Sequence, residues 1–245
     1  MSEHTTLRID CHVHTDDSFD SPASLESVLA SAATAGLDGI VVTDHDEIGN
    51  ALSAVDRAAA HGIVAVPGVE VSTADGHVLA VGVESCPPRG TSFRDTVAWI
   101  REAGGVAVVP HPFQRTRHGV AAATITDCDG IEVFNAHTLT GLRNRQAGRF
   151  ARHEGYPAFA GSDAHRAENV GRAYTEVPVE TRAATAADVV DAMRAGRTCA
   201  RGRRLSPGQY VRKLAGSAKR NSARLLRPGR GDRTTGADGG QYRDR

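Results

Sequence analysis

Histidines and carboxylates follow apolar runs of this 245-residue chain at a spacing suited to metal binding. One run ends in Asp10, Cys11, His12, Val13 and His14. Alternate residues of an extended backbone project to the same side, so two imidazoles at this spacing can bind one ion. The segment Asp163-Ala-His165 repeats the spacing and predicts a second pair of ligands.

Four more polar residues lie next to other apolar runs: His45, Glu70 and His111 at the ends of runs, and His77 at the start of one. Each of them alone is compatible with an ordinary polar residue in a loop. Six of the eleven histidines, together with carboxylates, at such positions instead indicate one shared site. Buried charges gathered at one place are costly unless they are paired or coordinated, so bound cations are the expected solution.

The runs that precede these residues are rich in β-branched residues and predict buried strands. They cover residues 7–13, 39–43, 65–71, 78–83, 106–109, 131–134 and 158–160. Alanine-rich stretches separate most of them and predict helices, the first opened by Ser21 and Pro22. Repeated strand, helix and strand predicts parallel pairing with right-handed crossovers, in an open doubly wound sheet or a closed barrel. The carboxyl ends of barrel strands converge on one face, so the polar residues favour the barrel.

These motifs, in this order, resemble those of the polymerase and histidinol phosphatase (PHP) superfamily. The matching segments are Asp10-Cys-His-Val-His-Thr with Ser18-Phe-Asp20-Ser, Thr43-Asp-His45, Pro67-Gly-Val-Glu70-Val-Ser, Gly76-His77, Pro110-His111-Pro112 and Gly161-Ser-Asp163-Ala-His165. The resemblance covers residues 9–165. It implies a distorted seven-stranded TIM-like (β/α)7 barrel with two or three divalent ions, Zn, Mn or Fe, on its carboxyl-terminal face.

Carried over residue by residue, the resemblance implies three groups of ligands. His12, His14 and Asp163 would hold one ion, and Glu70 would bridge it to a second. The second would be completed by His77 and His111, and the third held by Asp20, His45 and His165, with Asp16 or Asp17 as substitutes for Asp20. Imidazole and carboxylate suit Zn, Mn and Fe alike, so the identity of the metal stays open.

Clustered cations lower the pKa of a bridging water toward neutrality and orient a phosphate ester, so no protein nucleophile is expected. The chain contains neither a GxSxG elbow nor a P-loop, which agrees with this expectation. Asp10 and Asp44 are expected to orient ligand imidazoles. Six residues are candidates for substrate binding: Arg115, Arg117, Arg143, Arg145, Arg166 and His137. For each of them the alternative is an ordinary solvent-exposed side chain.

Composition divides the chain into a body and a tail. Residues 1–200 carry 16 basic and 26 acidic residues, net −10, whereas 201–245 carry 13 basic and 3 acidic residues, net +10. Residues 1–205 are expected to form the barrel, and 206–245 a basic tail, partly helical and then disordered. Such a tail could bind RNA or another acidic surface, or have no partner. No apolar run is long enough for a membrane span and the first residues do not resemble a signal peptide, so a cytoplasmic address is expected.

The leading hypothesis is metal-dependent hydrolysis of a phosphomonoester, a nucleotide or a short oligonucleotide. Histidinol-phosphate phosphatase is the alternative within the same superfamily. An alternative of another class is a non-catalytic nucleic-acid-binding or accessory protein that acts through the basic tail. The sequence does not determine the oligomeric state.

Overall fold

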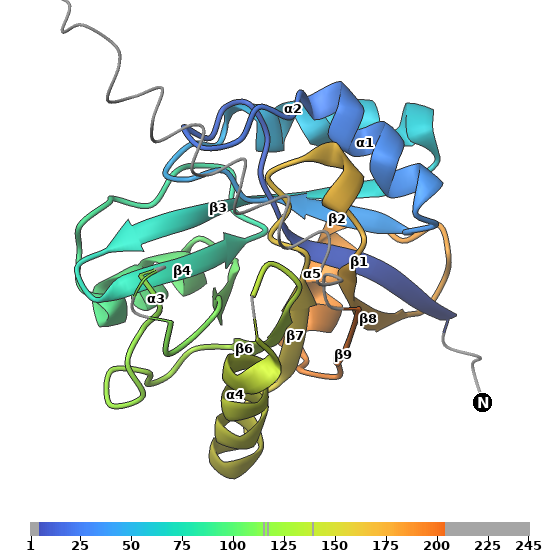
Figure 1. Ribbon diagram of the computed structural model, residues 1–245. Coiled ribbons are helices and arrows are strands. Elements are labelled where there is room, and N and C mark those ends of the chain that lie inside the picture. Colours follow the sequence, from blue (N-terminus) through green and yellow to red (C-terminus); the bar gives the residue numbers. More distant parts are fainter. Residues whose placement is uncertain (1–4, 115, 117, 139, 204–245) are drawn as a thin grey trace, which may run out of the picture. The chain divides into compact units, whose positions relative to one another are not determined.

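The computed structural model describes residues 5–114, 116, 118–138 and 140–203 (Figure 1). All of them lie within Met1–Leu205, the first of the two units into which the chain divides. The expected basic tail, 206–245, lies outside the described residues, as do Arg115 and Arg117. Among the described residues, no helix is both long and apolar enough to cross a membrane.

Nine described strands form one mixed sheet in the order β7-β6-β5-β4-β3-β2-β1-β8-β9. They are β1 (Thr5–Val13), β2 (Gly39–Val42), β3 (Val64–Thr73), β4 (Gly76–Val81), β5 (Val106–Val109), β6 (Gly130–Asn135), β7 (Ala158–Gly161), β8 (Ala173–Val179) and β9 (Cys199–Gly202). The seven predicted runs correspond to β1 through β7. β8 lacks an apolar run because its residues alternate between buried and half-buried and include Glu176 and Pro178, and β9 lacks one because that strand is largely exposed. Neither strand was therefore predicted.

The expectation of uniformly parallel pairing is wrong. β1, β2 and β3 pair in parallel, as do β5, β6 and β7, but β4 is antiparallel to both β3 and β5. Thr73 pairs with Gly76 in a tight hairpin, and this connection is too short for the crossover that parallel strands require. β8 is likewise antiparallel to β1 and β9.

The sheet curls into a nearly closed, barrel-like form. Thr175 of β8 bridges to β7, because its Oγ1 accepts from Ala160 N at 2.9 Å and donates to Ala160 O at 3.0 Å. Beyond β7, Val13 pairs with Ala164, and Asp163 N donates to His12 O at 2.8 Å. The fold is therefore a mixed α/β barrel rather than an open doubly wound sheet, with nine described strands instead of the expected seven.

Five α-helices are described, and four of them cover the outside of the sheet. They are α1 (Leu25–Thr34), α2 (Gly49–Arg57), α3 (Phe93–Glu102), α4 (Gly141–Glu154) and α5 (Ala186–Arg194), with 3-10 turns at η1 (Ala58–His61) and η3 (Ala167–Asn169). α1 and α2 lie together beside β2 and β3, and α3 and α4 pack on β4, β5 and β6 (Figure 1).

Helix α1 begins three residues later than Ser21 and Pro22 predict. Its cap is Ser24, whose side chain accepts from Ser27 N at 3.3 Å. Ser21 instead donates through Oγ to His14 O and His165 O, at 3.3 and 3.2 Å. The residue expected to cap a helix therefore fastens together two segments that carry candidate ligands.

Helix α5 covers one end of the barrel interior. Its Val189, Val190 and Met193 belong to one cluster with apolar side chains from β1, β2, β3, β4, β5, β7 and β8, which fill the interior at this end. A Cβ at Gly82 would lie 2.5 Å from Val190, so only glycine admits this approach of α5 to the end of β4. The carboxyl ends of β1, β3, β5 and β7 point to the other end.

Candidate metal centre

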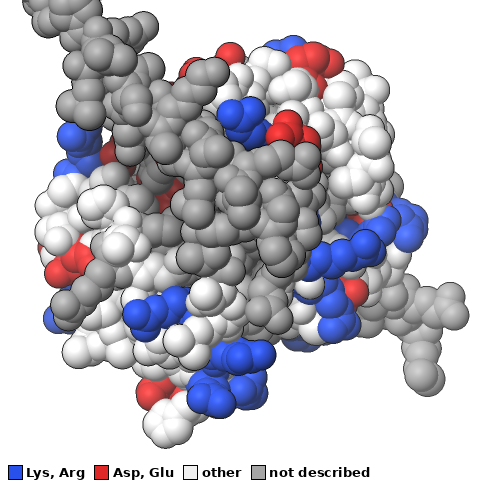
Figure 2. Space-filling view, in the orientation of Figure 1, with Lys and Arg blue, Asp and Glu red and all other residues white. Residues whose placement is uncertain are grey.

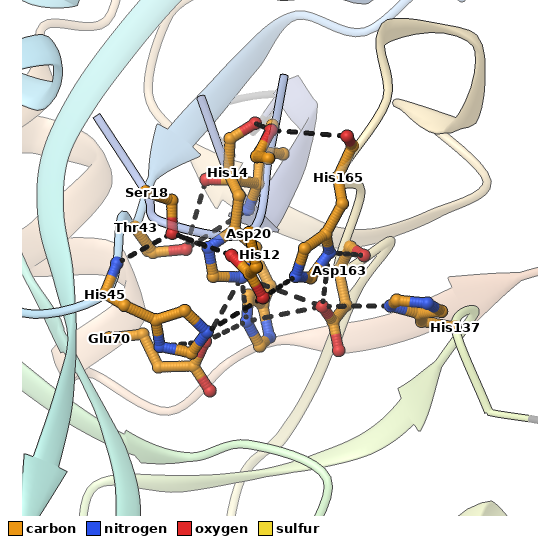
Figure 3. A network of polar contacts seen from close by, with 12 residues as sticks. His12, His14, Ser18, Asp20, Thr43, His45, Glu70, His137, Asp163 and His165 are labelled. Atoms are coloured by element: carbon orange, nitrogen blue, oxygen red, sulfur yellow. Dashed lines mark hydrogen bonds and ion pairs between the residues drawn. The ribbon is translucent and has the colours of Figure 1, made fainter. Parts of the chain in front are cut away.

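The candidate ligands lie together at the end of the barrel opposite α5. They come from the strand ends and the loops that follow. Figure 3 labels all of them except His77 and His111. The set comprises all nine residues expected from the sequence: His12, His14, Asp20, His45, Glu70, His77, His111, Asp163 and His165. Their ligand atoms form four overlapping groups, and a fifth group joins Asp163 and His165 to His137; within each group all atoms lie within 4.8 Å of one another. Several groups combine residues that the resemblance assigns to different ions.

The middle of the cluster is a contact between two buried imidazoles and one carboxylate. His12 Nε2 lies 3.1 Å from His14 Nε2, and the two nitrogens lie 3.0 and 3.1 Å from Glu70 Oε2. Asp163 Oδ1 is 3.6 Å from His14 Nε2. Lone pairs of nitrogen and oxygen directed at one point suit a divalent cation, so the donors present fit an ion here.

The second oxygen of Glu70 faces a different pair of histidines. Its Oε1 lies 2.8 Å from His77 Nδ1 and 2.9 Å from His111 Nε2. The two oxygens of one buried carboxylate therefore face separate sets of imidazoles, which is the arrangement a bridging ligand requires. His45 is a further neighbour, with Nδ1 3.4 Å from Glu70 Oε2, so the geometry allows more than one division of ligands among ions.

The third expected group lies nearest to solvent. Asp20 Oδ2 is 2.8 Å from His165 Nε2 and 3.6 Å from His45 Nε2. Asp16 and Asp17 are directed elsewhere, because Asp16 Oδ1 accepts from Asn50 Nδ2 and Asp17 Oδ2 accepts from Asn50 N. Asp20, rather than either substitute, therefore lies at the cluster.

The charges of the cluster shift its pKa values in opposite directions. Burial raises the pKa of Glu70, but the charges of His12 and His45 and several hydrogen bonds outweigh it and hold this pKa well below its usual range. Burial lowers the pKa of His12, but Glu70, Asp163 and Glu132 together raise it well above its usual value. The pKa of His14 falls to about 3, because burial and the charge of His165 both lower it. Without ions, the cluster therefore holds protons on some imidazoles and not on others.

Glu132 of β6 is a buried carboxylate behind the ligands, and it was not among the expected site residues. Its Oε1 lies 3.2 Å from His12 Nδ1, and its Oε2 accepts from His111 N at 2.7 Å and from Asn135 Nδ2 at 2.9 Å. Asn135 also donates to Asp163 Oδ2 at 2.9 Å. The available signal was a charged residue inside an apolar strand, which requires a polar partner when buried.

The backbone around these ligands is unusually constrained. His111 and Asp163 have φ values of 29° and 52°, in the left-handed region that side chains other than glycine rarely adopt. At Gly161 a Cβ would lie 2.4 Å from His12 Cβ and 2.8 Å from Glu132 Oε1. Glycine is therefore required where β7 passes the ligand His12.

The expected role of Asp10 and Asp44 as partners of ligand imidazoles is wrong. Asp10 accepts from Ser162 N and Gly171 N at 2.8 and 2.9 Å. Asp44 accepts from Thr15 N and Oγ1, both at 2.5 Å. Burial raises the pKa of each carboxyl to about 6. These two side chains secure the ligand-bearing loops through peptide and hydroxyl groups, and Glu132 is the carboxylate that contacts a ligand ring.

A cavity of about 660 Å³ opens beside the cluster. Its lining includes Phe19, His118, the 72–76 hairpin and six of the candidate ligands: Asp20, His45, Glu70, His77, His111 and His165. His118 is exposed and stacks on His77 with ring centres 5.1 Å apart. The cavity has room for a small phosphorylated compound.

Two of the described candidates for substrate contact, Arg143 and Arg166, do not line this cavity, and Arg115 and Arg117 lie outside the described residues. Arg143 and Arg166 are exposed, and Arg143 donates to Gln146 within α4. Basic side chains gather at the lower edge of the face in Figure 2, over α4, which also carries Arg145. His137 lies against the cluster itself, with Nδ1 3.3 Å from Asp163 Oδ1, the same distance as His165 Nδ1.

The sequence matches two models of known protein families. The PHP domain model matches residues 10–144, and the PHP-associated model matches residues 141–198. The chain belongs to the PHP superfamily. The two matches together extend from Asp10 in β1 to Thr198 next to β9, so they contain all nine candidate ligands. Membership makes the protein a metal-dependent hydrolase of phosphate esters.

Relatives of this PHP protein agree with the assignment of the fold. An uncharacterized protein of Methanocaldococcus jannaschii is 29% identical over 152 residues, 58% of this chain and 89% of that protein. A two-domain protein of Bacteroides vulgatus, which contains a predicted PHP-like metal-dependent phosphoesterase, is 21% identical with a TM-score of 0.67; the match covers 81% of this chain and 65% of that one. The lesion-specific endonuclease Q of Pyrococcus furiosus is 14% identical with a TM-score of 0.56, over 80% of this chain and 58% of that one.

Proposed function

We propose that this PHP protein hydrolyses a phosphomonoester, a nucleotide or a short oligonucleotide at a site for up to three divalent ions. One observation carries the proposal: the two oxygens of buried Glu70 face two separate pairs of histidines, His12 with His14 and His77 with His111. A structural carboxylate needs only one such set of partners. This mixture of imidazole and carboxylate ligands suits Zn, Mn or Fe ions.

The chain's own groups would bind the ions and fix the position of the substrate. His12, His14, Glu70 and Asp163 would form the inner part of the site, His77 and His111 would continue it, and Asp20, His45 and His165 would form the outer part. The bound ions would neutralise phosphate charge and lower the pKa of a water molecule. Glu132 would hold the His12 ring by its Nδ1, so that Nε2 points toward the ions.

The relatives support substrates of more than one size. Endonuclease Q of Pyrococcus furiosus is a lesion-specific endonuclease, so a barrel of this kind accommodates nucleic acid in that protein. The Bacteroides vulgatus protein contains a predicted phosphoesterase with the same fold. We therefore include both a nucleotide and a short oligonucleotide as candidate substrates. Binding of nucleic acid through 206–245 remains a separate prediction, tested by truncation after Leu205 and the salt dependence of RNA binding.

The test combines metal analysis with hydrolysis. The purified protein is analysed for bound metal, and hydrolysis of an aryl phosphate and of a short 5′-phosphorylated RNA is measured with added Mn or Zn. The Glu70→Gln variant is compared with Glu176→Gln, whose glutamate pairs with Arg201 away from the cluster. We expect two or more ions per chain in the parent and in Glu176→Gln, and loss of at least one ion and of hydrolysis, by about 100-fold or more, in Glu70→Gln.

The same measurements can contradict the proposal. Absence of turnover on both substrates after addition of Mn or Zn, in a folded protein, would exclude the phosphoesterase. Equal metal content in Glu70→Gln and in the parent would exclude Glu70 as the bridging ligand, even if the activity were confirmed.

A further inference from the structure

Phe19 is an exposed aromatic residue inside the cavity of the proposed active site. Its exposed fraction is 78%, the highest among the large apolar side chains that are described as exposed. Isolated apolar side chains on a protein surface need no explanation. Phe19 differs because its ring lines the cavity beside the candidate ligands His45 and Asp20.

Among the described residues, the ring of Phe19 makes one contact with another ring. It stacks on His45, with ring centres 5.1 Å apart and an angle of 27° between the planes. The flanking residues are fixed as well, since Ser18 Oγ donates to Asp20 Oδ1 at 3.1 Å and accepts from His45 N at 3.2 Å. The His45 ring therefore supports one face of Phe19, and the high exposure leaves its other surface open to the cavity.

The rest of the cavity continues this aromatic surface. His45 contacts His77 edge to face with ring centres 5.0 Å apart, and His77 stacks on His118. The described lining residues include the carboxylates of Asp20, Glu70 and Asp75, but neither Lys nor Arg. Such a lining favours a planar, weakly charged group next to the phosphate that the ions would hold, since an exposed ring binds a flat group by stacking.

We infer that Phe19 is a stacking platform for a nucleobase or a similar planar aromatic group of the substrate. The site would then prefer nucleoside monophosphates to phosphate esters without a ring, such as sugar phosphates. This inference rests on the proposed function, because the phosphate must be held at the ion site for the base to reach Phe19.

The test uses two substrates that differ only by the base, adenosine 5′-monophosphate and ribose 5-phosphate. We expect the parent to have the higher kcat/KM for the nucleotide. Phe19→Ala should reduce the ratio of the two kcat/KM values on the order of tenfold or more, mainly through KM, and Phe19→Trp should preserve it. Leu142→Ala, a matched control that removes an exposed apolar side chain outside the cavity lining, should leave the ratio unchanged.

Failure of the platform is distinguishable from failure of the phosphoesterase. If both substrates are hydrolysed and Phe19→Ala does not change their ratio, the platform is wrong and the proposed function stands. If neither is hydrolysed with Mn or Zn, the proposed function is wrong, and the platform is judged by binding. In that case the fluorescence of Phe19→Trp, corrected for Trp99 in the parent, should be quenched by adenosine 5′-monophosphate and not by ribose 5-phosphate; equal or absent quenching overturns the platform.

Discussion

At one end of the barrel interior, apolar side chains from seven strands and α5 form one cluster, while at the other end histidines and carboxylates contact one another. The apolar cluster and the inner ligands His12, His14 and Glu70 are buried. Burial stabilises the apolar end, because it removes hydrocarbon from water. At the polar end burial carries a cost that ions would offset, since it takes several charged groups out of water close to one another. The comparison predicts that stability depends mainly on the first end and ion binding on the second.

The largest effect on folding is expected at the α5 end. Met193→Ala should lower the free energy of unfolding by about 2–5 kcal/mol, because Met193 is fully buried against the strands. Metal content per folded chain should be unchanged. Chemical denaturation and metal analysis of the same samples provide the measurement, and a parallel loss of bound metal would contradict the separation of the two ends.

Behind the ligands, Glu132→Gln should weaken binding of at least one ion by about 10–100-fold. The reason is that Glu132 contacts the His12 ring and also accepts from the backbone of His111. Calorimetric titration with Mn or Zn measures the effect, with Glu176→Gln as the control. Unchanged affinity in a folded Glu132→Gln protein would show that ring orientation does not depend on this carboxylate.

Raising the pH should strengthen ion binding and should lower the stability of the metal-free protein. The charges of neighbouring carboxylates outweigh burial and raise the pKa of His12 and of His45 above the usual 6.5. Ions require neutral imidazoles, so apparent affinity should increase with pH, by about tenfold per pH unit for each proton displaced. The pKa of His14 is lowered to about 3, so this ring is already neutral and releases no proton.

In the metal-free protein, the raised pKa values of His12 and His45 contribute stability that is fully present below pH 6.5 and is lost as the pH rises through these values. Thermal unfolding across pH 6–8, with and without Mn, measures how stability and its increase on ion binding change with pH. Titration in buffers of different protonation enthalpy counts the protons released. An affinity that does not change over this range would contradict the assignment of protons to the two rings.

The smallest effect is expected at the solvent side of the cluster. Ser18→Ala removes a buried hydroxyl that contacts Asp20 Oδ1, the backbone N–H of His45 and, at 3.3 Å, His14 Nδ1. The loss should be about 1 kcal/mol, and it should weaken ion binding by a few-fold. Metal titration monitored at each binding step tests this, and unchanged affinity at every step would show that ion binding does not depend on the hydroxyl.

The sequence by itself determined the chemistry of this protein and most of its strands. His12 with His14 and Asp163 with His165 lie two residues apart in extended segments, so local geometry alone directs each pair to one side. The apolar runs that became β1 to β7 are visible because buried strands require them. The motifs at their ends are local too, and they indicated the PHP superfamily before the barrel was known.

Only the tertiary structure decided how these parts meet. The direction of β4, the pairing of β8 with β1 and the closure of β7 onto β1 depend on contacts between distant segments, which local pattern does not encode. The same holds for Glu132 of β6, which contacts the ring of His12 although the two residues are 120 positions apart in sequence and their strands do not pair. Phe19 likewise acquires its place in the cavity from the loop that His45 supports, because a ring's surroundings are set by the fold and not by its neighbours in the chain.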